Sequence, residues 1–459
     1  MDLCLTDEEF LTLEQIGFAS KSTRPGWLNV SADIVNANIS DLSFEHPSSG
    51  ASAVLQKGTS VTNFMVEMPE ALGGLAAIGF IGFEDVAASD VLKSFNKLEN
   101  DDSLEVIDSF IRERMEKIGW RSFTPEVAMA KLHIKPEIIA AILDPRFKQV
   151  YGTTELVDWL IDTLDANHTV LLRLLRMRKL KAMALVKLLR RLTPKYGLRA
   201  PRIGQAIYMA TLKPNFQTQE SGSCDSSNTI VDAGPEVLPD HTTLYTAQVI
   251  RYMGVAGETS CIYFDGMTPG GDMTPTHIRG FQYWTPDKDW AEMKREYTAG
   301  RCRYSSTCLF TMQIPNSVLA KLRQKNLNLS SCWKMCVWLC RKKHKLEDFP
   351  KDFHHIFSQD ILKGPICCNV SNVVESIGDL DSAKWRIPDR DVVRLNGRVC
   401  THWALITLRA TNVARTPTKS KTHIQAYQPQ VISDVWDSNG SYWVKVLPRP
   451  AHPTRVDPK

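Results

Sequence analysis

Residues 249–287 combine two strand patterns with the start of a helix, and this order of elements restricts the folds open to the chain. The first pattern, Val249 to Val255, contains a basic and an aromatic residue, Arg251 and Tyr252. A loop rich in Gly, Pro and Thr follows, and the second pattern, Gly280 to Asp287, is rich in aromatics and leads directly into a helix. This order predicts a cleft with an arginine on one wall and aromatic rings on the other, which suits a flat, anionic ligand such as a dinucleotide.

Length and charge distribution indicate a globular protein with several parts. The chain has 459 residues, of which 43% are apolar and 23% charged, so two or three domains could each bury a core. The charges are unevenly spread, because residues 1–110 contain 18 acidic and five basic residues, whereas residues 166–219 contain no acidic residue. We expect these oppositely charged regions to attract each other or to bind separate partners.

The N-terminus does not resemble a secretory signal, because its first residues are acidic where a signal would be basic. The longest apolar stretch, Ala71 to Phe83, contains four glycines and is too short to cross a bilayer. Eleven cysteines, an odd number spread over a long chain, favour reduced thiols over a disulfide framework. The sequence therefore predicts a cytoplasmic or other intracellular protein without a signal peptide or membrane span.

Changes in residue pattern predict where helices and strands lie. Residues 20–85 are rich in Val, Ile, Thr, Gly and Ser, which favours short strands and loops. From Ala88 onward, apolar residues recur three and four apart, and Pro follows Thr or Lys at two predicted helix starts. The expected helices are Asp90–Asn100, Leu104–Ile118, Thr124–Leu132, Lys135–Leu143, Glu155–Leu164 and Asn167–Leu192. Beyond residue 240 the expected strands are Leu244–Met253, Phe281–Trp284, Thr307–Ile314 and His402–Ala410, and the expected helices are Lys288–Tyr297, Ser317–Gln324 and Ser331–Arg341.

These patterns predict an α+β chain in five parts. The boundary near residue 240 follows from a polar segment that is low in aromatics and is succeeded by two X-Pro steps. Asn439-Gly440 between aromatic and β-branched residues predicts a C-terminal hairpin. The predicted parts are an acidic strand and loop region at 1–87, a helical region at 88–215 that ends in a basic helix, a linker at 216–240, a mixed sheet domain with flanking helices at 241–411, and a tail at 412–459.

The predicted helix at 167–192 is strongly basic. It carries eight cations and could bind a phosphate backbone or an anionic membrane surface. Leucines interrupt every basic face, however, so we favour a structural helix whose neighbour is the acidic N-terminal region and which ends at Thr193-Pro194. We do not expect nucleic acid to be a partner, and binding through residues 173–191 stays a weaker alternative.

Several segments in order resemble a fungal family of ADP-ribosyltransferase-like domains. The first landmarks are Arg251-Tyr252-Met253-Gly254, Asp265-Gly266-Met267 and the strand-to-helix junction Gly280-Phe281-Gln282-Tyr283-Trp284-Thr285-Pro286-Asp287. Later landmarks that resemble the family are Met312–Pro315, Trp333–Arg341 and Asp360–Cys367. The resemblance covers roughly residues 240–411, and it lies in the order and spacing of the pieces.

This resemblance implies a split, mixed β-sheet that holds NAD in a cleft. It implies that Arg251 grips the phosphates or ribose, with Tyr252, Gly280 and Phe281 beside it, and that Tyr283 or Trp284 stacks on nicotinamide. Adjacent residues of a strand point to opposite faces, so at least one of these two aromatics is expected in the core.

The family pattern places a Glu or Gln on a later strand, where it orients the acceptor and stabilises an oxocarbenium-like transition state. The matching positions here are Thr401 and His402, which makes His402 the candidate catalytic residue. Because histidine cannot serve as a carboxylate, two functions remain open. One is an enzyme that transfers or hydrolyses ADP-ribose from NAD, and the other is a catalytically inactive relative that binds a protein partner.

A metal site is not expected. Cys332, Cys336, Cys340 and His344 recur every fourth residue, but a helix turns about 40° further with each such step, so the four side chains form a stripe and cannot converge on one ion. Asp287 and Asp289 open a predicted helix, where carboxylates commonly cap the first turn.

Overall fold

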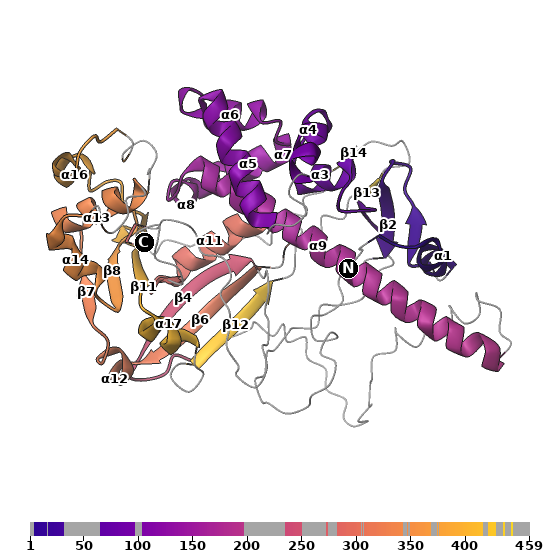
Figure 1. The fold of residues 1–459 in the computed structure, drawn as a ribbon. Helices are drawn as coiled ribbons and strands as arrows, with labels where there is room; N and C mark the ends of the chain where they lie inside the picture. The colour runs from indigo at the N-terminus through magenta and orange to yellow at the C-terminus, as the bar shows by residue number, and fades with distance from the viewer. Residues whose placement is uncertain are drawn as a thin grey trace, which may run out of the picture.

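We describe the protein from a computed structural model, whose trace is shown in Figure 1. Four of the site residues predicted above, Arg251, Tyr252, Gly280 and Phe281, lie outside the described residues. The structure describes residues 4–15, 17–31, 65–96, 103–196, 235–249, 272–273, 282–303, 305, 307–342, 347, 349–368, 374, 376–415, 421–427, 435–436 and 442–443.

The N-terminal part is a small three-stranded antiparallel sheet flanked by helices. Strand order is β1-β2-β3, and side chains from this sheet form one core with Leu171 and Leu174 of a long helix described below. Burial of apolar side chains between the sheet and the helix holds the two together. The elements are α1 (Asp7–Gln15), β1 (Ala19–Lys21), β2 (Trp27–Ser31), β3 (Met65–Pro69) and α3 (Leu75–Ile81).

One element of this part corrects the sequence prediction of strands and loops over residues 20–85. Leu75–Ile81 forms α3, and its side chains enter two cores, because Ala77 packs with the small sheet whereas Ile78 packs with the helices that follow. A helix buried on two sides shows no amphipathic stripe, so the periodicity that marks surface helices is missing here.

The middle part is helical, as the sequence predicted. Pro125 and Pro136 occupy the first turns of two of the helices, and the Thr124 side chain caps the first of them by accepting a hydrogen bond from the Val127 amide. The elements are α4 (Asp85–Asn96), α5 (Ser103–Ile118), η2 (Trp120–Ser122), α6 (Pro125–Lys131), α7 (Pro136–Ile142), η3 (Pro145–Phe147), α8 (Lys148–Tyr151) and α9 (Leu156–Tyr196).

Helix α9 is a single rod of 41 residues that runs from the helical part past the small N-terminal sheet (Figure 1). The two helices predicted at 155–164 and 167–192 are therefore one. The predicted end at Thr193-Pro194 is also wrong, because the helix continues through Pro194 to Tyr196. Pro194 lies in the last turn of the helix, so its missing amide removes one backbone hydrogen bond close to the end of the helix and does not interrupt the rest.

Two basic residues of α9 are buried in contacts with the N-terminal part. Lys179 is 8% exposed and forms an ion pair of 2.7 Å with Glu9, while it also donates to the Cys4 carbonyl. Arg178 is fully buried and donates to the carbonyl oxygens of Pro69 and Glu70. The prediction that the acidic N-terminal region is the neighbour of this helix is thus confirmed at these two cations.

The C-terminal part contains two larger sheets and the two-stranded β9–β10 hairpin. The first is antiparallel, in the order β12-β6-β4, and the second is mixed, in the order β5-β11-β8-β7, with β7 parallel to β8. A backbone bridge between Tyr245 and Thr285 joins them through hydrogen bonds of 2.7 and 2.9 Å. The strands are β4 (His241–Val249), β5 (Gln282–Trp284), β6 (Thr307–Pro315), β7 (Gln324–Asn326), β8 (Ile361–Pro365), β9 (Arg394–Leu395), β10 (Arg398–Val399), β11 (Thr401–Leu405) and β12 (Lys421–Tyr427).

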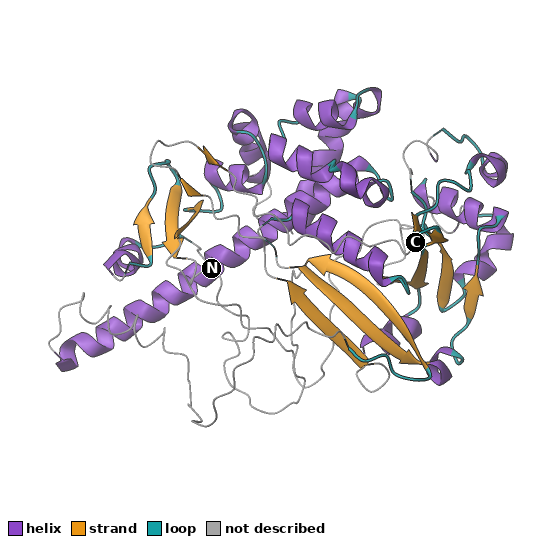
Figure 2. Cartoon of the chain, turned by 180° about the vertical axis from the view of Figure 1, so that it is seen from behind, coloured by secondary structure: helices purple, strands orange, loops and turns teal. Residues whose placement is uncertain are grey.

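Helices cover these sheets on their outer faces. Figure 2 shows the three long strands of the antiparallel sheet from behind, with α11 running beside them toward the helical part. Side chains of α13 and α14 pack on the face of the mixed sheet that carries Ala404 and Tyr283, and α16 packs on α13. The helices are α11 (Lys288–Arg301), α12 (Asn316–Leu319), α13 (Ser331–Arg341), α14 (Lys351–Phe357), α16 (Leu380–Arg386) and α17 (Leu408–Arg415).

Two sequence predictions in this part need correction. The predicted strand His402–Ala410 stops at Leu405, because Thr407 accepts a hydrogen bond from the Ala410 amide and caps the start of α17. The predicted helix Ser317–Gln324 is only the four-residue α12, since Gln324 already pairs with β8 as the first residue of β7.

The core of the helical part extends across residue 240 into the sheet domain. Trp290 and Tyr297 of α11 belong to the same core cluster as Trp159 of α9. Arg301 is 2% exposed, pairs with Asp162 at 2.9 Å, and lies over the Trp159 ring. Because α11 is shared in this way, experiments on the sheet domain should use the full chain.

The described structure has helices and sheets in the proportions of the α+β class, in agreement with the predicted class. The C-terminal strands β13 (Val435–Trp436) and β14 (Tyr442–Trp443) pair antiparallel, as the Asn-Gly signal predicted. Within the described part of the chain, no helix combines the length and the apolar character needed to cross a membrane.

Candidate functional site

Strand β11 lies at the centre of the candidate site, because β5 pairs on one of its edges and β8 on the other. The register aligns Ala404 with Tyr283, Trp403 with Trp284, and His402 with Gly364. Since directly paired residues point to the same face of a sheet, Tyr283 and His402 share one face, and Trp284 points to the other.

Trp284 belongs to the core and not to a ligand site. Its side chain is 1% exposed, packs among residues of the antiparallel sheet, and donates from Nε1 to the Gln282 amide oxygen at 3.2 Å. No face of its ring is free to stack on nicotinamide in this structure. Of the two aromatics that the sequence offered for stacking, only Tyr283 remains a candidate.

The opposite face brings Tyr283 and His402 together. Their ring centroids are 5.1 Å apart with an interplanar angle of 51°, and the Tyr283 hydroxyl accepts a hydrogen bond of 3.1 Å from the Met273 amide. This amide comes from the short described segment Asp272–Met273, ten residues before Tyr283 and far from β11 in sequence. The structure therefore places one predicted binding residue beside the predicted catalytic residue.

His402 is held as a neutral imidazole. Burial lowers its pKa well below the ordinary value of 6.5, and the positive charges of Lys294 and Arg341 lower it further. Its Nδ1 is buried and has no hydrogen-bond partner among the described residues. A neutral ring with an unsatisfied nitrogen can bind a polar group of a ligand, which would satisfy that nitrogen.

Lys294 supplies positive charge to the same region from α11. Burial lowers its pKa, an effect that Asp162 opposes and Arg301 reinforces. Asp162 is already paired with Arg301, and no hydrogen bond or ion pair joins the Lys294 ammonium group to a described residue. A partly buried ammonium group without a counter-ion favours an anionic ligand, because the ligand would replace the lost hydration.

Arg341 and Asp272 form a buried ion pair behind this region. Their side chains are 8% and 0% exposed, and the closest N–O distance is 2.6 Å. Asp272 also accepts from the Cys367 amide at 2.7 Å, and Arg341 donates to the Thr154 hydroxyl at 3.2 Å. Both partners are therefore satisfied within the protein, and the pair serves to link α13 to the residues that precede α9.

The sequence analysis missed the position of Asp287. This residue precedes the first turn of α11, but its side chain does not cap that turn, and its Oδ2 instead accepts from the Thr401 amide of β11 at 3.0 Å. A carboxylate thus lies at the start of β11, one residue from His402. The Thr-Pro-Asp sequence before a predicted helix suggested a cap, and no sequence signal indicated the contact with a strand 114 residues away.

Asp287 also lines a pocket of about 160 Å³ at the N-terminus of α11. The opposite wall comes from the β9–β10 hairpin, whose turn residues Asn396 and Gly397 have positive φ angles of 52° and 79°, as a tight two-residue turn requires. Burial, assisted by Asp287, raises the pKa of the Cys400 thiol to about 11, so this cysteine is not a nucleophile at neutral pH. The pocket lining consists of Pro286, Asp287, Lys288, Asp289, Leu395, Arg398 and Cys400.

The described cysteines are free thiols. Cys332, Cys336 and Cys340 occupy one face of α13. No group of His, Cys, Asp and Glu side chains in the described part of the chain could hold a metal ion.

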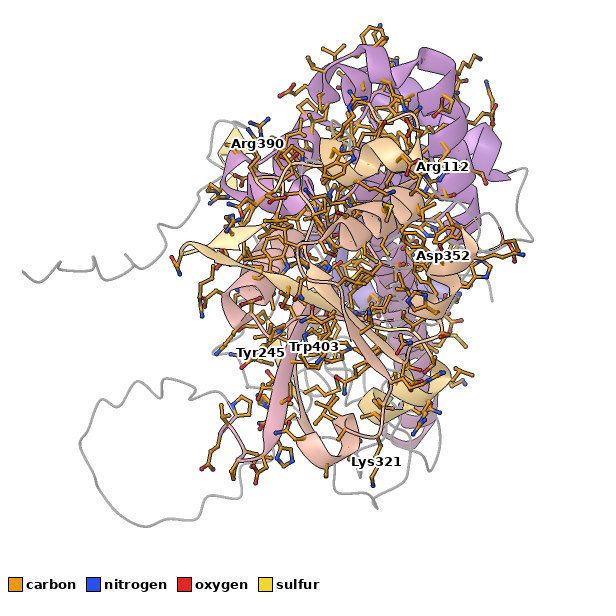
Figure 3. All side chains as sticks on the ribbon, turned by 90° about the vertical axis from the view of Figure 1, so that its left-hand side faces the viewer. Arg112, Tyr245, Lys321, Asp352, Arg390 and Trp403 are labelled. Atoms are coloured by element: carbon orange, nitrogen blue, oxygen red, sulfur yellow. The ribbon has the colours of Figure 1, made fainter. Side chains whose placement is uncertain are left out.

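Figure 3 shows the side chains from the left-hand side of Figure 1, with Tyr245 of β4 and Trp403 of β11 labelled close together in the lower half of the view. Both strands belong to the junction between the two sheets. No protein-family model, no curated protein and no solved structure matches this chain. Its function must therefore be inferred from the residues of this site.

Proposed function

We propose that the protein is an ADP-ribosyltransferase-like protein that binds NAD against Tyr283 and His402. The observation that carries this proposal is the tilted pair of rings, in which the buried His402 Nδ1 has no partner among the described residues, while Lys294, which pairs with none of them, contributes positive charge nearby. A flat, neutral or cationic ring stacked on Tyr283 and a diphosphate near Lys294 would satisfy both groups.

Two further features support the proposal. The sheets are split and one of them is mixed, as the resemblance implies for this family, and the strand β5 with the following α11 stands where the family has its strand-to-helix junction. Arg251, the residue expected to grip the phosphates or ribose, would add a second cation to the same ligand. A dinucleotide is proposed because Tyr283 offers a ring for stacking, His402 offers a ring nitrogen for a hydrogen bond, and Lys294 and Arg251 offer positive charge for a diphosphate.

The chemistry of transfer or hydrolysis would require a carboxylate near the nicotinamide–ribose bond to stabilise the positive charge that develops there. Histidine at position 402 is neutral and cannot provide it. Asp287 accepts a hydrogen bond from the Thr401 amide, next to His402 on β11, and we propose it as the residue that stabilises that charge if the protein is an enzyme.

One observation favours the second function, that of an inactive relative which binds a protein partner. Both nearby carboxylates already accept backbone hydrogen bonds, Asp287 from Thr401 and Asp272 from Cys367. A carboxylate held in this way is less available to a reacting centre. In this function the region around Tyr283 and His402 would bind a ligand without catalysing a reaction, or would only stabilise the fold.

The test is calorimetric titration of the full chain with NAD, comparing wild type with Tyr283→Leu and Lys294→Met. Loss of the stacking ring or of the ammonium group should each weaken binding about tenfold or more. Lys148→Met is the matched control, because Lys148 is exposed on α8 and should leave the affinity unchanged. A folded wild-type protein that takes up no NAD would reject the proposal.

A second measurement separates the two functions. Chromatographic detection of nicotinamide after incubation with NAD reports transfer or hydrolysis, and Asp287→Asn should abolish the release if Asp287 supplies the carboxylate. NAD binding without nicotinamide release would assign the chain to the inactive class.

A further inference from the structure

A second basic region, distinct from α9, lies between α16 and β11. Residues 384–398 contain four arginines at a spacing of four, together with a tryptophan. All four arginines are exposed, and none forms an ion pair with a described residue. We call this region the arginine segment, and it consists of Trp385, Arg386, Arg390, Arg394 and Arg398.

The acidic residues of this region do not neutralise its arginines. Asp381 pairs with Lys384 at 2.7 Å, and Asp389 pairs with Lys334 at 2.7 Å. Asp379 accepts from the amide and hydroxyl groups of Ser382. Lysines and a helix cap therefore take up these carboxylates, with an electrostatic interaction between Arg386 and Asp379. Arg394 and Arg398 point to opposite faces of the β9–β10 hairpin, because Arg398 pairs with Leu395 and Arg394 with Val399. The exposed guanidinium groups can therefore bind an anionic partner on either side of this hairpin.

Trp385 is the most exposed large apolar side chain in the described part of the chain, at 80%. The fold explains its position, because α16 packs on α13 through the buried Ala383 and directs Trp385 away from that contact. Helix α16 lies at the left-hand edge of Figure 1, and Figure 3, drawn from that side, labels Arg390. The indole ring is thus exposed on the surface of the domain, next in sequence to Arg386.

An exposed tryptophan together with exposed arginines fits a nucleic-acid partner better than a protein partner. The core of a protein interface is depleted in charge and contains several apolar side chains, whereas the arginine segment offers a single exposed aromatic ring that is followed in the sequence by four exposed arginines. Single-stranded nucleic acid matches that pattern, because its phosphates pair with arginines and its unpaired bases stack on an exposed ring. The 13 residues from Arg386 to Arg398 span at most about 40 Å, which is within the reach of a short oligonucleotide.

We infer that the arginine segment is a binding surface for single-stranded nucleic acid. This inference does not depend on NAD binding, although Arg398 also lines the pocket beside Asp287. It also differs from the nucleic-acid alternative considered for residues 173–191, because there Arg178 and Lys179 are buried in contacts with the N-terminal part.

The test is fluorescence anisotropy of a labelled single-stranded oligonucleotide about 12 nucleotides long, titrated with the full chain over a range of salt concentrations. Four phosphate contacts would give a slope of about −3 in a plot of log K against log salt. The variant with Arg386, Arg390, Arg394 and Arg398 all changed to Ala should weaken binding at least tenfold at low salt and remove most of that slope.

Trp385→Ala isolates the stacking contribution. It should weaken binding of the single strand about tenfold without changing the salt slope, and it should have little effect on a duplex of the same sequence. The control is the double variant Arg121→Ala/Arg146→Ala, which removes two exposed arginines that are paired with Glu116 and Asp144. This control should bind like the wild type.

Three results would overturn the inference. The first is no binding of the single strand at low salt, and the second is binding that the four-arginine variant does not reduce. The third is that polyglutamate binds as tightly as the oligonucleotide and Trp385→Ala weakens both equally, which would indicate an acidic protein partner instead. Because all five side chains are on the surface, the variants should fold, and a thermal melt of each confirms this.

Discussion

The basic residues of α9 and those of the arginine segment meet opposite surroundings. In α9, Arg178 and Lys179 are buried against the N-terminal part, where backbone carbonyls and Glu9 accept their hydrogen bonds. In the arginine segment, neighbouring acids pair with lysines, and the arginines stay exposed. The comparison teaches that a cluster of cations in a sequence indicates either a structural contact or a binding surface, and that the nearest available acceptors decide which.

The largest effect is expected at Arg301, a buried cation of the same kind as those in α9. Arg301→Met should lower the free energy of unfolding by about 3 kcal/mol, because the side chain is 1% exposed and its loss also removes its bonds to Trp159 and Thr163. Urea unfolding measures the change. Arg121→Met, which removes a half-exposed arginine, should cost less than about 1 kcal/mol. Equal losses in the two variants would show that the buried contacts of Arg301 do not add to stability.

The pair between Lys179 and Glu9 tests whether the basic helix is held by the acidic N-terminal part. Lys179→Met should destabilise the protein by about 2 kcal/mol, because Glu9 is left unpaired with only 9% of its side chain exposed. Adding Glu9→Gln should recover part of this loss. A double-mutant cycle measures the coupling, and strictly additive losses would show that the two charges do not interact.

The same pair predicts a dependence on pH. Burial raises the pKa of Glu9, but hydrogen bonds from Lys179 and Thr6 outweigh this and lower it below the ordinary 4.5. A lowered folded-state pKa means that the stabilisation is complete above about pH 4.5 and is lost as the pH falls through the folded-state value. Acid titration of unfolding should show a steeper loss below pH 4.5 in the wild type than in Glu9→Gln.

The smallest effect on stability is expected in the arginine segment. Changing Arg386, Arg390 or Arg394 to Gln should alter the free energy of unfolding by less than about 0.5 kcal/mol each, because these side chains are exposed and unpaired among the described residues. Thermal or urea unfolding measures this. A loss of unfolding free energy as large as that of Lys179→Met would show that these arginines stabilise the fold, as the buried cations of α9 do.

Regular elements with strong local signals were predictable. Helix α13 begins and ends at Ser331 and Arg341 as predicted, because the Ser330 cap and the apolar spacing are both local. The hairpin of β13 and β14 followed from Asn-Gly. Helix α3 and the cap of α17 were missed, since the first lacks an amphipathic stripe and the second lies in a run of strand-forming residues.

The candidate site was predictable only in part. Adjacent positions on a strand required Tyr283 and Trp284 to face opposite sides, but the sequence could not say which of them was in the core. The contact between Asp287 and Thr401 joins residues that are 114 positions apart, and it depends on the register of β11 against β5. Such register is set by the packing of whole sheets and not by the local sequence.

The sequence by itself determined the helical middle part, four of the strands beyond residue 240 with the C-terminal hairpin, and the basic character of the segment that forms α9, because these features depend on local spacing and charge. The tertiary structure alone decided that Trp284 is core, that His402 is a neutral imidazole against Tyr283, and that the cations of α9 rather than those of the arginine segment are buried. The physical reason is that burial and pairing are set by which segments meet across the fold, and chain-distant neighbours such as Glu9 and Lys179 leave no local mark.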